Sequence, residues 1–158
     1  MVDCYTIKSI AQGTENTIFS NNHNKKGDYP MSTEQNKAVV RRFVEASLNT
    51  MNSNLVDDLF APDYVNHMVP GGIEGFKQFF SMIRSTYPDL KIEYKIERLM
   101  AEGDYVMMRA SSRLSNNGKE ATGSGLGEYR LANGKIVEDW PLSGAAELMQ
   151  QVGVALPG

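Results

Sequence analysis

Cysteine is nearly absent from this chain of 158 residues, since Cys4 is the only one. A single cysteine excludes an intrachain disulfide and any metal site built on cysteines, and it favours a reducing, cytoplasmic location. Histidine is almost as scarce, with His23 and His67 alone. Because no spacing of His, Asp and Glu resembles a known ligand set, we expect no metal site.

An excess of basic residues is also missing. The chain has 16 Lys and Arg against 19 Asp and Glu, which gives a formal net charge of −3. Nucleic-acid binders usually carry a basic patch, so we expect no nucleic-acid partner. No apolar run approaches the roughly 20 residues that cross a bilayer, so we expect no membrane partner. Phosphate-binding loops, dinucleotide fingerprints and nucleophile elbows are absent as well.

What the chain does contain predicts one domain with a real core, because 41% of its residues are hydrophobic. Residues 1–30 differ from the rest, since the stretch 12–28 is rich in Asn, Thr, Ser and Gly and has few apolar residues. We interpret residues 1–30 as a flexible tail and residues 31–158 as the folded domain.

Helical and strand patterns divide that domain. Apolar residues recur at helical spacing from Ser32 to Leu48 and again over 54–61 and 73–86, and Ser32 or Thr33 can cap the first helix. A short strand is expected at 63–67. Alternation and turn residues then predict strands over 90–100, 105–114, 120–131 and 135–142, followed by a helix at 144–152.

This order predicts an α+β fold in which three helices cover the concave face of a strongly curved antiparallel sheet. Gly123, Gly125 and Gly127 occupy alternate positions of one strand, where glycine permits bulges or sharp bending. A sheet bent in this way encloses a conical cavity, so we describe the expected architecture as a conical barrel.

The most informative residues lie around Asn133-Gly134, which is a strong signal for a two-residue hairpin. Such a turn pairs Ala132 with Lys135 and would place Glu128 opposite Asp139. Two adjacent carboxylates raise one pKa and favour acid or base chemistry at Asp139. Arg130 could instead make the cluster a simple ion network, so both interpretations stay open.

His67 is the second candidate, because histidine titrates near neutrality and often acts as an acid or base. On a strand it shares a face with Val65, so it faces the pocket if Val65 faces the interior. The alternative is a core histidine bonded to a backbone carbonyl. For the pocket wall we predict the aromatic and flexible side chains Trp140, Tyr64, Tyr129, Met108 and Phe80, most of which also serve the core.

Several strings, in this order, resemble the SnoaL-like polyketide cyclases of the nuclear-transport-factor-two-like superfamily. They begin with Asn36-Lys37-Ala38-Val39-Val40-Arg41-Arg42-Phe43 and Ala61-Pro62-Asp63-Tyr64-Val65-Asn66-His67. They continue with Gly75-Phe76-Lys77-Gln78-Phe79, Tyr87-Pro88-Asp89-Leu90, Ala101-Glu102-Gly103-Asp104, Gly134-Lys135-Ile136-Val137-Glu138 and Leu148-Met149-Gln150-Gln151-Val152-Gly153. The resemblance spans about residues 33–157.

The resemblance implies a deep apolar pocket, no cofactor and a homodimer formed through the sheet. It also implies an intramolecular aldol step with an aspartate as acid/base. The family's usual Glu-His-Trp-Asp reads here as Glu138-Asp139-Trp140-Pro141, so proline stands where a carboxylate is expected. With a two-residue gap, Asp139-Trp140-Pro141 instead matches the Asp-Trp-Pro of some cyclases.

We therefore expect a cofactor-free cyclase- or isomerase-type enzyme that moves a proton on a small hydrophobic carbonyl compound. Asp139 would be the acid/base, and His67 would donate to the developing enolate oxygen. The alternative is a module of the same fold that binds a ligand or dimerises without catalysis, in which Asp139 is merely ion-paired.

Overall fold

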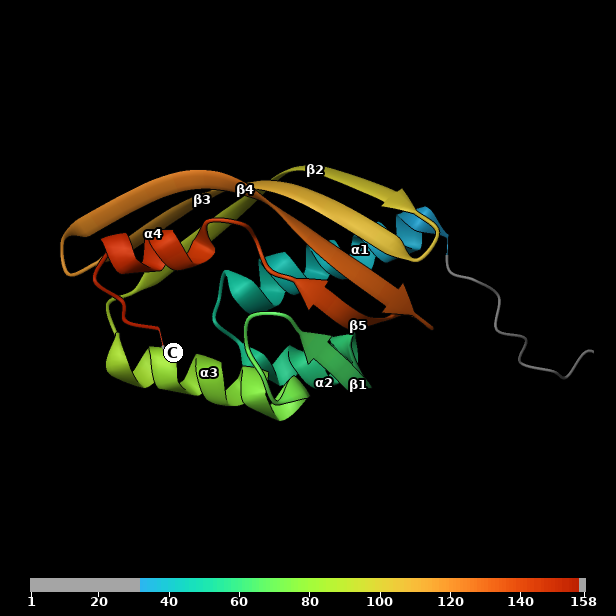
Figure 1. Ribbon diagram of the computed structural model, residues 1–158, viewed down its shortest axis with the longest axis horizontal. Coiled ribbons are helices and arrows are strands. Elements are labelled where there is room, and N and C mark those ends of the chain that lie inside the picture. The colour runs from blue at the N-terminus through green and yellow to red at the C-terminus, as the bar shows by residue number, and fades with distance from the viewer. Residues whose placement is uncertain (1–31, 157–158) are drawn as a thin grey trace, which may run out of the picture.

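A five-stranded sheet curves around the helices in residues 32–156, the part of the chain that the computed structural model describes (Figure 1). Its order is β1-β5-β4-β3-β2, and the strands are β1 (Phe60–Asn66), β2 (Lys91–Glu102), β3 (Tyr105–Asn116), β4 (Lys119–Ala132) and β5 (Lys135–Trp140). The tail expected at residues 1–30 lies outside this part.

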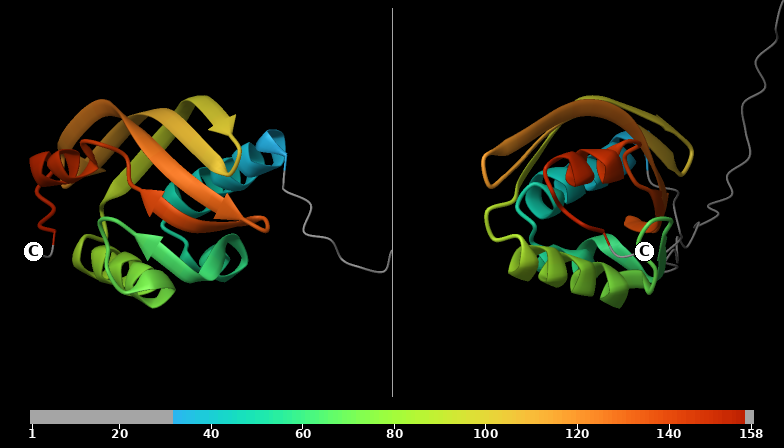
Figure 2. Two further views of the ribbon diagram at one scale, coloured as in Figure 1. Left: turned by 45° about the vertical axis from the view of Figure 1, so that its right-hand side comes forward. Right: turned by 60° about the vertical axis from the view of Figure 1, so that its left-hand side comes forward.

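The helices fill the hollow side of the sheet. They are α1 (Thr33–Phe43), continued by the π-helical turn η1 (Val44–Leu48), the 3₁₀ turn η2 (Ser53–Leu55), α2 (Val56–Leu59), α3 (Gly72–Thr86) and α4 (Ala145–Gln151). Figure 2 shows the long strands β2, β3 and β4 arching over α1 and α4, with α3 and β1 on the other side of these two helices. The α+β prediction is confirmed, although the sheet is curved rather than closed.

The sheet differs from expectation at β1, which pairs with β5 in parallel. The other three pairs are antiparallel, so the sheet is mixed. The reason is the connection: β1 and β5 are separated by more than sixty residues, and no hairpin forces them to run in opposite directions.

Local sequence signals account for the element boundaries. The side chain of Ser32 caps α1, since its Oγ accepts from the amide of Gln35 at 3.2 Å while Gln35 Oε1 accepts from the Ser32 amide at 2.9 Å. This reciprocal pair satisfies two amides that a helix start leaves free. Asn133 and Gly134 both have positive φ, at 50° and 78°, which confirms the expected hairpin turn.

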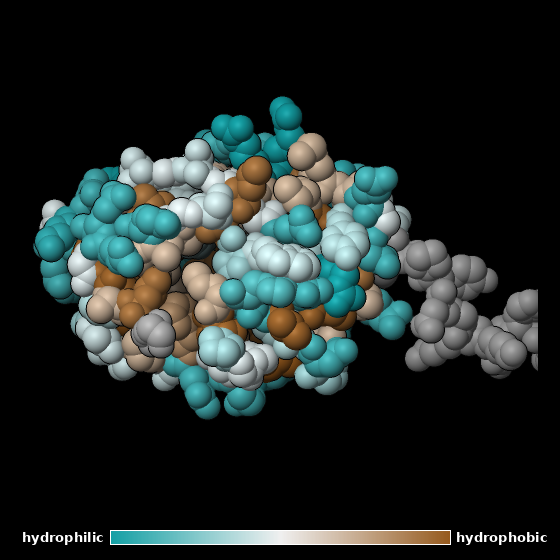
Figure 3. Space-filling view, viewed as in Figure 1, coloured by the Kyte–Doolittle hydropathy of each residue, from teal (hydrophilic) through white to brown (hydrophobic). Residues whose placement is uncertain are grey.

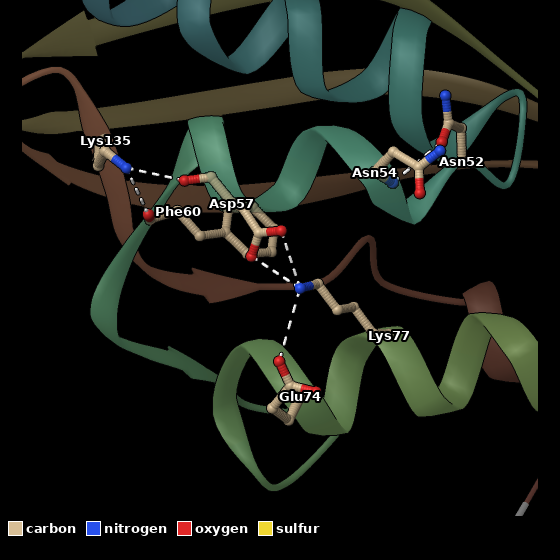
Figure 4. Close-up of polar contacts among 7 residues, drawn as sticks. All are labelled: Asn52, Asn54, Asp57, Phe60, Glu74, Lys77 and Lys135. Carbon is tan, nitrogen blue, oxygen red and sulfur yellow. Dashed lines mark hydrogen bonds and ion pairs between the residues drawn. The ribbon is translucent and has the colours of Figure 1, made fainter.

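Two lysines fasten α2 to its neighbours (Figure 4). Lys77 of α3 contacts both carboxylate oxygens of Asp57 at 2.7 and 2.9 Å. Lys135 at the start of β5 donates to the backbone carbonyls of Asp57 and Phe60 at 2.9 and 3.2 Å. A lysine near carbonyls at a helix end satisfies acceptors that the helix cannot. These contacts fix where β1 leaves α2.

A bulge in β5 changes the register predicted from the hairpin. Ala132 pairs with Lys135 as expected, and Leu131 pairs with Ile136, but Arg130 then pairs with Glu138. Val137 is the extra residue, and it has no partner on β4. Asp139 therefore lies opposite Tyr129, and the prediction that it lies opposite Glu128 is wrong.

The glycines of β4 allow close packing as well as bending. A Cβ at Gly125 would lie 2.2 Å from the carbonyl oxygen of Ser143, and one at Gly123 would lie 3.1 Å from the side chain of Leu148. The loop before α4 and α4 itself can therefore rest directly on the inner face of the sheet. Within residues 32–156 no helix is both long and apolar enough to cross a membrane.

Candidate active site

Side chains from all five strands and from α1, α3 and α4 line a cavity of about 60 Å³. Hydrophobic side chains surround a hollow between α4 and α3 in the space-filling view (Figure 3). The wall is mostly apolar and includes Phe43, Leu48, Phe76, Phe79, Phe80, Met51, Met68, Met108 and Met149. Its polar members are Asn66, Tyr94, Tyr129 and Asp139. Methionine makes such a wall easy to deform.

Asp139 is the buried carboxyl group of this wall. Its side chain is 3% exposed, and burial raises its pKa to about 7, against the opposing effects of hydrogen bonds and of His67. A charged carboxylate loses hydration when it is buried among apolar groups, so the neutral form gains. Near neutral pH both forms of Asp139 are therefore populated, as an acid/base group requires.

Tyr64 holds Asp139 in place from the neighbouring strand. Its hydroxyl donates to Asp139 Oδ1 at 2.9 Å. Burial, followed by the charge of Asp139, raises the pKa of Tyr64 well above its usual range, so the phenol stays protonated and remains a donor. The phenol thus occupies one oxygen of Asp139, Oδ1.

Asn66 determines the direction of that hydrogen bond. Its Oδ1 accepts from the backbone amides of Met68 at 2.8 Å and Val69 at 2.6 Å, which fixes the orientation of the amide group. Its Nδ2 therefore faces the Tyr64 hydroxyl and donates to it at 3.0 Å. Because the Tyr64 oxygen already accepts from Asn66, its own proton is directed to Asp139.

His67 lies on the opposite face of the sheet. Its Nε2 is 2.9 Å from Glu138 Oε1, and its ring stacks on Trp140 with centroids 4.4 Å apart and planes at 8°. The side chain is 40% exposed. The shared face with Val65 holds, but Val65 is itself exposed, so the interior residues of β1 here are Tyr64 and Asn66. The structure does not bring His67 and Asp139 to one cavity.

Glu138 completes an ion cluster on this outer face. Besides His67, it accepts from Arg130 Nε at 2.8 Å. The hydrogen bonds from His67 and then from Arg130 lower the pKa of Glu138. The ion network that the sequence left open for Asp139 and Arg130 therefore forms around Glu138 instead.

The residues predicted for the pocket wall also divide between the cavity and the outer face of the sheet. Tyr129, Met108 and Phe80 line the cavity. Tyr64 is not part of the wall but donates a hydrogen bond to Asp139, which is. Trp140 packs outside against His67. Sequence reasoning missed Asn66 and Tyr94 as polar groups of the site, and the Tyr64-Val65-Asn66 alternation was the available signal for Asn66. Pro141 also borders the cavity, beside Asp139 and without a carboxylate of its own.

A mixed, curved sheet wrapped over helices, with one buried carboxyl in an apolar cavity, defines the class of pocket proteins with the nuclear-transport-factor-two-like fold. Residues 38–152 match the family model for the SnoaL-like polyketide cyclases. The chain belongs to this family, which confirms the resemblance seen in its sequence.

Solved structures support the same fold. A candidate polyketide cyclase from Bacillus cereus is 28% identical, with a TM-score of 0.64, over 79% of this chain and 87% of that one. IdmH from Streptomyces antibioticus, also a candidate polyketide cyclase, is 22% identical with a TM-score of 0.62, over 76% and 99%. An epoxide hydrolase of the LEH-like type from M. tuberculosis is 18% identical with a TM-score of 0.56, over 76% and 86%. A search of curated proteins gave no match.

Proposed function

We propose that this protein is a cofactor-free enzyme that moves a proton on a small hydrophobic carbonyl compound, with Asp139 as the acid/base. The observation that carries the proposal is the buried Asp139 carboxyl, with a pKa of about 7, on the wall of an apolar cavity. The relatives described as polyketide cyclases and an epoxide hydrolase support small-molecule chemistry in this fold, without deciding which reaction occurs here.

The proposed step needs no electron donor or acceptor. The Asp139 carboxylate takes a proton from the carbon next to the carbonyl group. The electron pair of that C–H bond forms a C=C bond, and the carbonyl π electrons move to oxygen to give an enolate. Protonated Asp139 then returns the proton to carbon for isomerisation, or to a newly formed alkoxide after ring closure.

Hydrogen exchange tests this step without knowledge of the natural substrate. We expect the protein to accelerate deuterium uptake from D₂O at the α-carbons of cyclopentanone, followed by proton NMR. Asp139→Asn should lower that rate by about 10²–10⁴-fold, since it removes the acid/base group. Glu138→Gln is the matched control, because it alters the adjacent carboxylate on the other face.

Equal rates for wild type and Asp139→Asn would overturn the proposal, and so would a wild-type rate no faster than buffer. Saturable ketone binding without exchange would then favour the alternative, a module that binds a ligand without catalysis.

Two copies of the chain are also proposed to associate through the outer face of the sheet. Met100, Tyr105 and Leu126 are exposed there at 53%, 46% and 49%, and covering these apolar side chains in a dimer would be favourable. Sedimentation velocity should show a dimer that Leu126→Glu dissociates, whereas a wild-type monomer would contradict this. The cytoplasmic location stays a prediction.

A further inference from the structure

Two tyrosine hydroxyls of the cavity take no part in the proposed proton transfer to and from Asp139. Tyr129 is 2% exposed and lines the cavity together with Tyr94. Within residues 32–156 neither hydroxyl has a hydrogen-bond partner, whereas Tyr64 has two. Both tyrosines line the cavity, so each hydroxyl is free to bond a group that enters it.

The position of Tyr129 is fixed beside the acid/base group. Tyr129 pairs with Asp139 across β4 and β5, and its ring packs edge-on against Phe43 with centroids 6.0 Å apart. Its hydroxyl extends over Gly127, where an added Cβ would lie 3.6 Å from the oxygen. The glycine thus leaves room for the phenol along the inner face of the strand.

Tyr94 is fixed from the other edge of the sheet. Asn49 binds both backbone polar groups of Tyr94, accepting from its amide at 2.7 Å and donating to its carbonyl at 3.0 Å. This pair occupies the open edge of β2 and leaves the phenol directed into the cavity wall. Tyr94 and Tyr129 line the same cavity, from β2 and β4.

Both groups remain donors over the physiological range. Burial raises the pKa of Tyr94 to about 12. Burial, followed by the charges of Asp139 and Tyr94, raises the pKa of Tyr129 well above its usual range. A protonated phenol in an apolar cavity can stabilise negative charge on a ligand oxygen and needs little reorganisation to do so.

We infer that the hydroxyls of Tyr129 and Tyr94 form the oxygen-binding site of the cavity, which takes the carbonyl oxygen of the substrate and holds its α-carbon against Asp139. This inference deepens the proposed function and rests on it for the direction of the chemistry. It assigns to the two tyrosines the donor role that the sequence suggested for His67. The ligand class is an apolar molecule with one ketone oxygen near its buried end.

A binding experiment tests the site separately from catalysis. The probe is cyclopentanone labelled with ¹³C at the carbonyl, compared with methylenecyclopentane, which has the same shape without the oxygen. We chose a small ring because the cavity is only about 60 Å³, and the methionine side chains of its wall must move to admit even six heavy atoms. We expect a downfield carbonyl shift in the bound ketone and about 10-fold tighter binding than the hydrocarbon.

The variants are chosen to remove single oxygen atoms. Tyr129→Phe should abolish most of the carbonyl shift and of the preference for the ketone, and Tyr94→Phe should reduce both. Tyr105→Phe, on the exposed outer face, is the matched control and should change neither. Asp139→Asn should keep the shift, so a failure of the proton-transfer proposal would remain visible as binding without exchange.

The inference is overturned if the double variant Tyr129→Phe/Tyr94→Phe stays folded and binds the ketone with the wild-type shift and preference. It is equally overturned if folded wild-type protein shows no saturable binding of the labelled ketone.

Discussion

Asp139 and Glu138 are adjacent carboxylic acids on one strand, and their surroundings are opposite. Asp139 faces the cavity, where burial raises its pKa to about 7. Glu138 faces outward, where His67 and Arg130 lower its pKa. The same functional group is thus tuned toward proton transfer on one face of β5 and toward an ion pair on the other. Chemical type alone does not identify the reactive residue.

The bulge at Val137 determines which of the two faces the cavity. Without the extra residue, the hairpin register would continue past Leu131, and Glu138 instead of Asp139 would lie opposite Tyr129. A shift of one residue exchanges the two faces of a strand. The difference between the two carboxylates therefore depends on the bulge at Val137.

The largest expected effect is a change in the rate of α-proton exchange when the inward-facing carboxyl is removed. Asp139→Asn should lower the rate of α-proton exchange by about 10²–10⁴-fold, because the acid/base group is lost. Glu138→Gln should change it by less than about 3-fold, since the side chain contacts His67 and Arg130 and does not line the cavity. Parallel exchange rates of the two folded variants measure the difference. A larger loss in Glu138→Gln would reverse the assignment.

Stability should depend on pH through Asp139. Its pKa in the folded state is above the ordinary value, so the neutral carboxyl favours folding at low pH and this contribution is lost as the pH rises from about 4 to about 7. Across that range the wild type should lose up to about 4 kcal/mol of unfolding free energy relative to Asp139→Asn.

Urea unfolding of both proteins at pH about 5 and about 8 measures about 3 kcal/mol of this loss, because part of it has already occurred at pH 5. The difference between the two proteins cancels the other titrating groups. A difference that does not change with pH would show that Asp139 titrates normally. For Glu138 the sign is opposite, because its lowered pKa favours folding once it is ionised and this contribution is lost on acidification.

A smaller effect is expected from the hydrogen bond between Tyr64 and Asp139. Tyr64→Phe removes a donor that favours the carboxylate, so the pKa of Asp139 should rise further. The cost in unfolding free energy should be about 1 kcal/mol, typical of one hydrogen bond. A ¹³C NMR titration of the Asp139 carboxyl measures the pKa, with Tyr105→Phe as control. A lower pKa in Tyr64→Phe would mean that the bond favours the neutral acid.

The smallest effect should follow a change on the outer face. His67→Ala removes a half-exposed hydrogen bond to Glu138 and the stack on Trp140, and such exposed polar contacts contribute about 0–1 kcal/mol. Because Trp140 is the chain's single tryptophan, its fluorescence reports the site directly, and acrylamide quenching should increase. Unchanged quenching would show that the stack does not cover Trp140 in solution.

Sequence reasoning could predict the elements of the fold because its signals are local. The Ser32 cap, the Asn133-Gly134 turn and the alternation of the strands each depend on a few neighbouring residues. The parallel pairing of β1 with β5 depends on residues far apart in sequence, and nothing local to β1 specifies it.

The site was predictable in part for the same reason. Asp139, Tyr129, Met108 and Phe80 lie at the cavity, as expected from their types and their strands or helix. His67 lies outside, because the face of β1 depends on its partner strand rather than on its own pattern. Trp140 lies outside because it follows the inward-facing Asp139 on β5. Asp139 itself faces the cavity for a reason that differs from the one predicted, since the bulge reversed the register.

Asp139 is tuned for proton transfer and Glu138 is not. The most direct test of this difference is a ¹³C NMR titration of the two side-chain carboxyls in the intact protein, with each resonance assigned by Asp139→Asn and Glu138→Gln. We predict a pKa of about 7 for Asp139 and a pKa below the ordinary value for Glu138. An Asp139 that titrates near its ordinary value of about 4 would contradict the account.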